Sequence, residues 1–468
     1  MTVNPLKCVY GKYVIPQRYV LCFMSFMAIF NAYCMRVCFN LALPEMVVPL
    51  SKKNTTGIDF CPENEEEKIK IKGGTYNWSQ SVQSNLLGAF FPGYVITHIP
   101  AGFLSDTLGG KHVLSLGILV SAILSALTPL TIYVGDWWLL MISRFLIGFT
   151  QGFLFPSVTT LLAKWVPKRE RSTLGTLVLT GPQVGSIFGN LISAYLMGIF
   201  GNWPIVFYFW AISSVIWYVF FIFMCFSEPS QHPFLPEKEA EMLAQEIGQT
   251  PNLKVPWIKL IFYPASLALM AGQVGHGAVF FLIVTDLPKY MKDVLKFNIK
   301  QNGVLNALPY LALWICGGIS GVISDILINK EIVSIVFIRK LYTTIASVGP
   351  SVCCVLAVYL GCNRIAAAAM FILGMFLMGP FYPGMRVNAL DLTKNFAGVL
   401  TAFVNGMGAL AFVPVQYAIG MILKADPSIA SWRLIFWIIF IICSVTNVIY
   451  VIWARGDRAE WDKVEEQE

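Results

Sequence analysis

Two arginines lie inside long apolar stretches, where their side chains could bind an anion. Arg36 belongs to the apolar run 19–43 and Arg144 to the run 138–162. An arginine at the centre of a membrane span costs about 2.5–3.5 kcal/mol, so it usually faces protein or a water-filled cavity. The alternative is a buried ion pair, but the nearby carboxylates are few and fall near the ends of apolar runs: Glu45, Asp106, Asp286, Asp325 and Asp391. We therefore favour anion contact for Arg36 and Arg144.

His276 is the third candidate, because it stands between Gly275 and Gly277 in the middle of the run 260–285. Histidine titrates near neutrality, so it could carry a proton or meet an anion. The two glycines would leave space around its ring. A hydrogen-bonded core histidine is an equally good interpretation. Arg386, by contrast, falls at the inner end of an apolar run, where a snorkelling arginine is commonplace.

Motifs of common enzyme classes are absent from the sequence. It has no H-E-x-x-H, no G-x-S-x-G and no Walker loop. No metal-ligand spacing joins its cysteines to its four histidines, which are His98, His112, His232 and His276. We therefore expect no enzyme, no metal site and no resident cofactor.

Composition defines the elements that must position these residues. Of the 468 residues, 56% are hydrophobic and 13% are charged, against about 25% charged in an average soluble protein. Twelve continuous apolar runs are long enough to span a membrane as helices. They are 19–43, 82–104, 113–133, 138–162, 173–198, 204–226, 260–285, 302–325, 341–361, 365–386, 396–422 and 431–453. A transmembrane β-barrel would show segments of about ten residues in which apolar and polar side chains alternate, whereas these runs are continuously apolar. We therefore predict an all-α membrane protein. Its first apolar run is too long for a cleaved signal peptide.

Charge placement predicts the orientation. The net charge is +7. If both termini are cytoplasmic, Lys and Arg concentrate in the inner segments, apart from those in two longer outer loops. Cytoplasmic loops are typically rich in Lys and Arg, so we predict this orientation. This distribution does not indicate nucleic-acid binding. In the longest outer loop, 51–80, Asn54 and Asn77 fit the N-glycosylation pattern, which agrees with that orientation. Cys61 and Cys362 fall in outer loops and could form one disulfide.

An internal repeat closes the second and the eighth apolar run. Residues 102–111 and 321–330 share Gly-x-x-x-Asp, with a Lys at the same offset after the Gly. A glycine that faces a neighbouring helix lets the backbones approach closely, and an aspartate can accept from a nearby helix N-terminus. We expect a conformational latch at the cytoplasmic face, formed by Gly102, Asp106, Lys111, Asp325 and Lys330.

The repeat divides the chain into two halves of six runs each. A polar inner connection, 227–259, lies between them and contains a charged segment, 236–246, that is typical of a surface helix. We predict an N-terminal six-helix bundle over 1–226, a cytoplasmic linker over 227–259, and a C-terminal six-helix bundle with a short tail over 260–468.

The segment 102–111 resembles the signature loop of the major facilitator superfamily. Further stretches resemble one branch of it, the anion:cation symporters, which include sialin, the vesicular glutamate transporters and the sodium-dependent phosphate cotransporters. The matching pieces are Arg36, 88–100, Arg144 with Gly148, 164–167 with 170–172, 285–291, 308–311, and 388–391 with 397–398. Gly275-His276 followed by 285–291 most resembles insect inorganic phosphate cotransporters. The resemblance implies two bundles that rock around a central site, anion transport, and Arg36 and Arg144 at positions that bind or gate the anion.

Departures from the family pattern bear on the coupling ion. Proton-coupled relatives place a Glu where this chain has Gln151, and sialin-like members have Glu and His where it has Ile147 and Thr159. The vesicular glutamate transporters have a His at the position of Leu87. Without these groups, sodium coupling or movement driven by the membrane potential is favoured over glutamate-mediated proton coupling. Glu45 could pair with a cation or meet the outer interface, and we favour the interface.

Together these features predict a secondary active transporter that moves a small anion by alternating access. Sodium-dependent cotransport of inorganic phosphate is the first hypothesis. The alternative is an organic anion (sialate, an acidic amino acid or urate) driven by protons or by the membrane potential, because arginine pairs with phosphate and carboxylate alike. We expect Na⁺, or alternatively H⁺, as coupling ion, membrane lipid but no nucleic acid as a further partner, and a monomer. The plasma membrane or a vesicular or lysosomal membrane would hold it.

Overall fold

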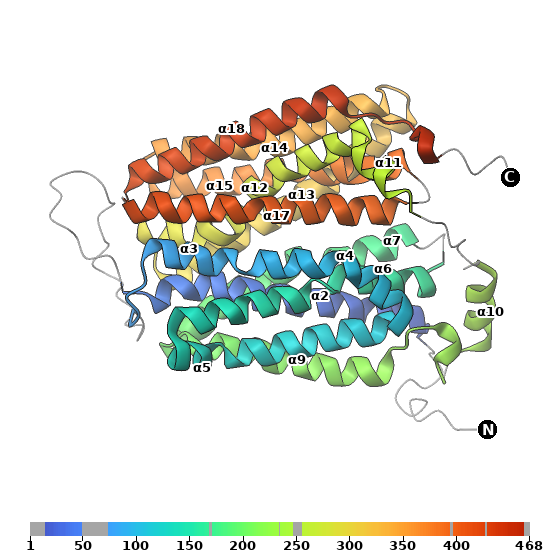
Figure 1. Ribbon diagram of the computed structural model, residues 1–468, viewed down its shortest axis with the longest axis horizontal. Helices are drawn as coiled ribbons and strands as arrows, with labels where there is room; N and C mark the ends of the chain where they lie inside the picture. Colours follow the sequence, from blue (N-terminus) through green and yellow to red (C-terminus); the bar gives the residue numbers. More distant parts are fainter. Residues whose placement is uncertain are drawn as a thin grey trace.

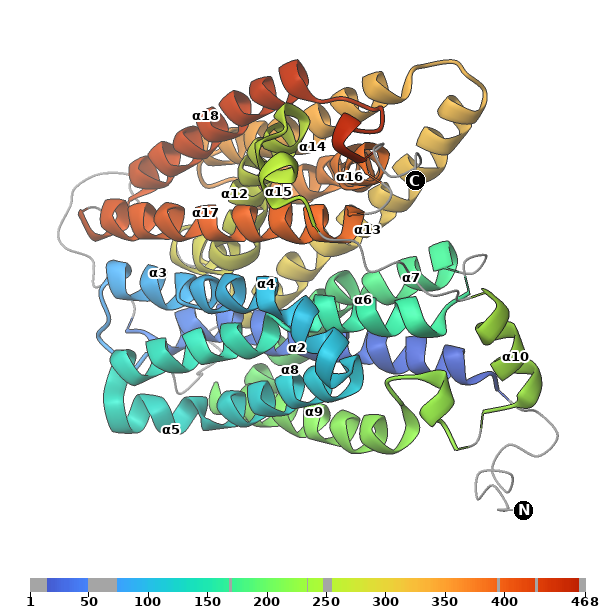
Figure 2. The same ribbon diagram turned by 45° about the vertical axis from the view of Figure 1, so that its right-hand side comes forward.

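Two groups of long helices make up the protein. The computed structural model describes residues 15–48, 74–167, 171–233, 235–246, 255–393, 396–425 and 428–462. Within these residues the chain is helical apart from short connections and one isolated β-bridge, between Val47 and Tyr76. Figure 1 shows the blue-to-green helices below and the yellow-to-red helices above, and the separation persists in the rotated view of Figure 2. The all-α prediction is confirmed for the described residues.

The first group contains eight helices in the described part of the chain. They are α2 (Gln17–Met46), α3 (Gln80–Gly88), α4 (Phe90–Leu108), α5 (Gly110–Gln151), α6 (Leu154–Trp165), α7 (Arg171–Leu179), α8 (Gly181–Phe200) and α9 (Pro204–Met224). After α9 the connection contains a short charged helix, α10 (Glu237–Glu246), where a surface helix is predicted.

The second group follows this connection. Its described helices are α11 (Trp257–Phe262), α12 (Pro264–Asp293), α13 (Ile299–Asn329), α14 (Ile335–Tyr359), α15 (Arg364–Met378), a π-helix (Tyr382–Arg386), α16 (Val387–Leu392), α17 (Ala397–Ala425) and α18 (Ile429–Trp453).

Ten described segments are long and apolar enough to cross a membrane, and one of them, Gly110–Trp165, is a hairpin rather than a single span. Its dihedrals leave the helical region at Gly135 and at Asp136, which has φ 49°. The indole of Trp78 donates to Asp136 Oδ1 at 2.6 Å and fixes this reversal. Helices α3 and α4 continue one another across Ala89 and supply a further crossing. Counting the hairpin twice and adding α3–α4, the described residues contain twelve segments that match the twelve apolar runs.

Helix α10 is held against the start of α2. The two carboxylate oxygens of Glu239 accept the backbone N–H groups of Gln17 at 2.9 Å and of Arg18 at 3.2 Å. These N–H groups belong to the first turn of α2, which has no partners within its own helix. The Arg18 guanidinium also pairs with Glu239 at 3.1 Å. The connection between the halves therefore caps the helix that carries Arg36.

Helices α2 and α12 form a seam between the halves. Asn40 Nδ2 donates to the Val284 carbonyl at 3.1 Å. Nearer the ends of the two helices, Lys292 Nζ lies 2.9 Å from Glu45 Oε1, and the Glu45 side chain is 11% exposed. The expectation that Glu45 meets the outer interface is therefore wrong, because it pairs across the seam with a lysine of the other half.

Apolar packing joins the halves beside this seam. One cluster contains side chains from α4, α5 and α17, namely Phe90, Phe91, Ile147, Ala409 and Phe412. Its rings are perpendicular or tilted, with Phe91 5.0 Å from Phe412 and 4.7 Å from Phe281. This aromatic contact brings α4 of one half and α12 of the other to the same point, which is where Arg36 lies.

Candidate functional site

Arg36 lies in an aromatic cage formed by both halves. Its side chain is 7% exposed, and its guanidinium carbon lies 4.3 Å from the ring centre of Phe90, 5.0 Å from Phe91, 5.5 Å from Phe281 and 5.7 Å from Tyr33. Such faces attract a cation. Among the described residues no carboxylate lies within ion-pair distance of Arg36, so its hydrogen-bond donors are not taken up by a partner charge.

Arg144 reaches the same cage from α5. It is 2% exposed, its guanidinium carbon lies 4.0 Å from the ring centre of Phe39 and 5.7 Å from Phe90, and its Nε has no hydrogen-bond partner among the described residues. The two arginines thus share the Phe90 ring. Two buried cations side by side repel one another and carry a large desolvation cost, so an anion bound between them would stabilise both.

Helix packing sets the position of Phe90. Gly148, one turn after Arg144 on α5, would place a Cβ only 1.9 Å from the Phe90 carbonyl oxygen. Gly93, on α4, would place one 2.2 Å from the Phe145 carbonyl oxygen. Only glycine permits this approach of α4 and α5, so the glycines hold the shared ring beside both guanidinium groups.

Gln151 is the residue on which the expectation about the coupling ion rests. It is buried, and its Nε2 donates to the Ala32 carbonyl of α2 at 3.4 Å. A neutral amide here fixes α5 against α2 one turn before Arg36. It offers no carboxylate to pair with Arg36 or Arg144.

His276 lies within the second half and is not in contact with either arginine among the described contacts. Its ring stacks on Phe381 with centres 3.6 Å apart and planes 2° apart, and its Nδ1 lies 3.4 Å from the Ala346 carbonyl oxygen. It is 5% exposed. This geometry matches a hydrogen-bonded core histidine, and a direct role in anion binding stays a prediction.

The glycines beside His276 serve helix packing. A Cβ at Gly275 would lie 2.0 Å from Thr446 Oγ1 on α18, and one at Gly277 would lie 3.3 Å from the Gly408 carbonyl oxygen on α17. The expectation that they leave space around the ring is wrong, because neighbouring helices occupy that space.

Arg386 is half-buried. It ends the π-helix, an uncommon element that often occurs at functional sites. Its Nε is buried without a hydrogen-bond partner among the described residues. The neighbouring Tyr382 hydroxyl accepts from Gln183 Nε2 of α8, which joins the two halves at this level. A snorkelling Arg386 stays a prediction.

Of the predicted latch, Lys111 is the best defined. Its ammonium lies 4.3 Å from the ring centre of Phe226, and its backbone N–H donates to Ser227 Oγ at 3.3 Å. This contact holds the start of α5 against the end of α9. Lys330 is exposed at the end of α13.

The other latch residues give less support. A Cβ on Gly102 would meet nothing within 4 Å, so the close helix approach predicted there is absent. The side chains of Asp106 and Asp325 lie outside what the structure describes. The latch therefore stays a prediction.

Of the two predicted glycosylation sites, Asn54 lies outside the described residues, whereas Asn77 is exposed three residues before the start of α3.

Of the two cysteines predicted to form a disulfide, Cys362 is disulfide-bonded, and Cys61 lies outside the described residues. Groups of three or more His, Cys, Asp or Glu side chains that could hold a metal are not found in the described part of the chain.

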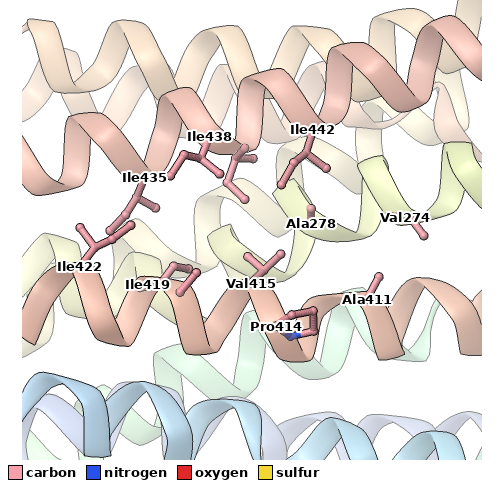
Figure 3. Close-up of a pocket in the computed structure, with 12 residues that line it drawn as sticks. Val274, Ala278, Ala411, Pro414, Val415, Ile419, Ile422, Ile435, Ile438 and Ile442 are labelled. Carbon is pink, nitrogen blue, oxygen red and sulfur yellow. The ribbon is translucent and has the colours of Figure 1, made fainter.

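A large apolar cavity lies away from the arginines. It has a volume of about 330 Å³ between α12, α17 and α18, and Figure 3 shows the isoleucines of α17 and α18 around it. Its lining, which includes Ile419, Ile435 and Ile442, contains no polar side chain. An anion would gain no hydrogen bond there, so the arginine cage is the better candidate.

Sequence reasoning located both arginines but missed the aromatic cage. Aromatic residues make up 14% of the chain, so no pattern distinguishes Phe90 or Phe281 from lipid-facing rings. Only the contacts of these rings with Arg36 in the folded structure distinguish them.

Two helical halves with a buried cationic site between them define a polytopic membrane carrier. The sequence pattern of the Major Facilitator Superfamily matches residues 21–416. The chain is 33% identical to a "Putative inorganic phosphate cotransporter" of Drosophila melanogaster over 96% of this chain and 87% of the relative. It is 31% identical to human sialin over 95% of this chain and 90% of sialin. It is 30% identical to the mouse sodium-dependent phosphate transport protein 1 over 92% of this chain and 91% of that protein.

Solved structures agree on the fold. A bacterial homologue of the human lysosomal transporter Spinster superposes with a TM-score of 0.69 at 12% identity, over 95% of this chain and 98% of that structure. A D-xylose–proton symporter superposes with a TM-score of 0.67 at 13% identity, over 93% and 98%. The chain therefore belongs to the major facilitator superfamily, in the branch of anion:cation symporters that holds these relatives. It is a multi-pass membrane transporter, and its relatives are transporters rather than enzymes.

Proposed function

We propose that this protein transports a small anion by alternating access and that Arg36 and Arg144 bind the anion. The observation that carries the proposal is the pair of buried guanidinium groups on one ring, without a carboxylate partner among the described residues. Each could donate charge-assisted hydrogen bonds to phosphate or carboxylate oxygens. Because both halves of the fold contribute to the cage, movement of one half against the other would open or close it.

Inorganic phosphate, carried together with sodium, is the proposed substrate. Supporting this choice, the insect relative and the mouse relative are both named for phosphate transport, at 33% and 30% identity. Gln151 also removes the glutamate that proton-coupled relatives use. An organic anion is the second candidate, because a vesicular glutamate transporter of Danio rerio is 27% identical over 96% of this chain.

Labelled phosphate uptake into proteoliposomes tests this function. We expect uptake to be faster under an inward sodium gradient than under an equal potassium gradient. Arg36→Gln should abolish the stimulated uptake. Arg433→Gln is the matched control, because Arg433 is exposed on α18, lies beside Tyr359 and is not part of the cage. Unchanged uptake by Arg36→Gln would refute the site, and phosphate flux absent from competent wild-type vesicles would refute the substrate.

A further inference from the structure

A buried carboxylate lies on α12, close to the seam between the halves. Asp286 is 1% exposed. Its Oδ2 accepts from Thr285 Oγ1 at 2.7 Å and from Gln416 Nε2 of α17. Its Oδ1, however, has no hydrogen-bond partner among the described residues, and the same is true of Gln416 Oε1. Two neighbouring side chains from two helices thus each have a buried oxygen atom without a donor.

Among the described residues no cation is in ion-pair contact with this carboxylate, although the charge of Lys289 acts on it from further away. Lys289, three residues further along α12, is 2% exposed, but it is not within ion-pair distance of Asp286, and its Nζ has no acceptor among the described residues. A buried ionised carboxylate is costly unless it is paired or coordinates an ion. Unsatisfied buried acceptors of this kind call for a bound ion or water.

The carboxylate is one helical turn from the arginine cage. The Thr285 hydroxyl oxygen also lies 2.6 Å from the Phe281 carbonyl oxygen, and the Phe281 ring faces Arg36 at 5.5 Å. On the opposing helix, Asn40 follows Arg36 by one turn and donates to the Val284 carbonyl. Thr285 therefore lies one turn after Phe281 of the cage on α12, and the carboxylate next to it is hydrogen-bonded to Gln416 of α17.

We propose that Asp286, Thr285 and Gln416 bind the sodium ion that is cotransported with the anion. Carboxylate, hydroxyl and amide oxygens are the ligands that hard cations prefer. This inference rests on the proposed function and names its cation site. An empty Asp286 would repel an anion at the cage, whereas a sodium ion would neutralise the carboxylate and favour anion binding. By linkage, the anion would favour sodium to the same extent.

Thermal unfolding of the purified protein tests sodium binding without reference to any substrate. We expect wild type to unfold at a higher temperature in sodium chloride than in an equal concentration of potassium chloride, because a ligand that binds only the folded state stabilises it. Asp286→Asn should lose this difference. Asp293→Asn is the control, because Asp293 ends the same helix and is partly exposed. If Asp286→Asn does not fold, Gln416→Met should raise the sodium concentration for half-maximal stabilisation several-fold.

Transport separates the cation site from the substrate assignment. In Asp286→Asn, sodium-driven phosphate accumulation should be lost, while exchange of internal for external phosphate continues. Sodium stabilisation or sodium-driven accumulation that survives in Asp286→Asn would overturn the proposal, as would wild type that responds to a pH gradient and not to sodium. If wild type shows the Asp286-dependent stabilisation but carries no phosphate, the substrate assignment fails and the sodium site stands.

Discussion

At the scale of single residues, Phe90 is the side chain that joins the two arginines. Its ring lies 4.3 Å from Arg36 and 5.7 Å from Arg144, and it is 1% exposed. Cation–π attraction is worth about 0.5–2 kcal/mol per contact. The ring therefore offsets part of the cost of two buried cations, and it keeps both guanidinium planes in place for a shared anion.

Replacing Phe90 tests this role. Phe90→Leu keeps an apolar side chain but removes the π face, so we expect the phosphate concentration for half-maximal uptake to rise several-fold. Phe223→Leu is the control, because Phe223 is 77% exposed on α9. If wild type and Phe90→Leu had equal half-saturating phosphate concentrations, the Phe90 ring would contribute only apolar packing and no cation–π attraction.

At the scale of helices, the close approach of α4 to α5 aligns the site. Gly148 meets the Phe90 backbone, so any Cβ there must push α4 away from α5. The same device recurs where α12 meets α18 at Gly275. Glycine in these helices is about 1 kcal/mol less favourable than alanine. The close backbone contact that it permits between membrane helices offsets this loss.

Gly148→Ala should displace Phe90 and thereby both reduce stability and weaken transport. Overpacking costs about 1–3 kcal/mol, which a lower unfolding temperature would reveal, and phosphate uptake should fall in the same variant. Gly406→Ala is the matched control on α17, because a Cβ there would meet nothing within 4 Å. A Gly148→Ala protein as stable and active as wild type would contradict the tight contact.

At the scale of the whole molecule, polar contacts join the two halves at the α2–α12 seam. The Glu45–Lys292 pair and the Asn40–Val284 bond both cross it. An ion pair that joins the two halves favours the conformation in which it is formed. Its effect on the equilibrium equals the difference in its interaction energy between the two conformations. The seam lies at the end of the molecule that the charge distribution predicts to be extracellular.

Breaking the Glu45–Lys292 pair should favour opening at that end. In a Val284→Cys background, Glu45→Gln should speed the reaction of the introduced thiol with a membrane-impermeant maleimide added outside. The charge swap Glu45→Lys with Lys292→Glu should return the rate toward that of the parent, since the pair is restored in reverse. Identical rates in all three proteins would mean that the pair does not hold the seam.

Much of this architecture follows from the sequence alone, for definable reasons. Apolar runs of fixed length predict the crossings, and a charge inside a run predicts a buried functional residue such as Arg36. Contacts between distant helices leave no such trace. In the sequence, Gly275 and Gly277 would look the same beside a ligand cavity and at a helix crossing. Asp286 falls near the end of its apolar run, yet α12 continues beyond it and keeps it buried.

Equilibrium binding of labelled phosphate to the purified protein in sodium buffer is the most direct test of the arginine site. A charge-assisted hydrogen bond contributes about 1.5–3 kcal/mol, so Arg36→Gln and Arg144→Gln should each weaken binding by about tenfold or more. Arg433→Gln should bind as wild type does. Wild-type affinity in both Arg36→Gln and Arg144→Gln would contradict the assignment of the anion to this pair.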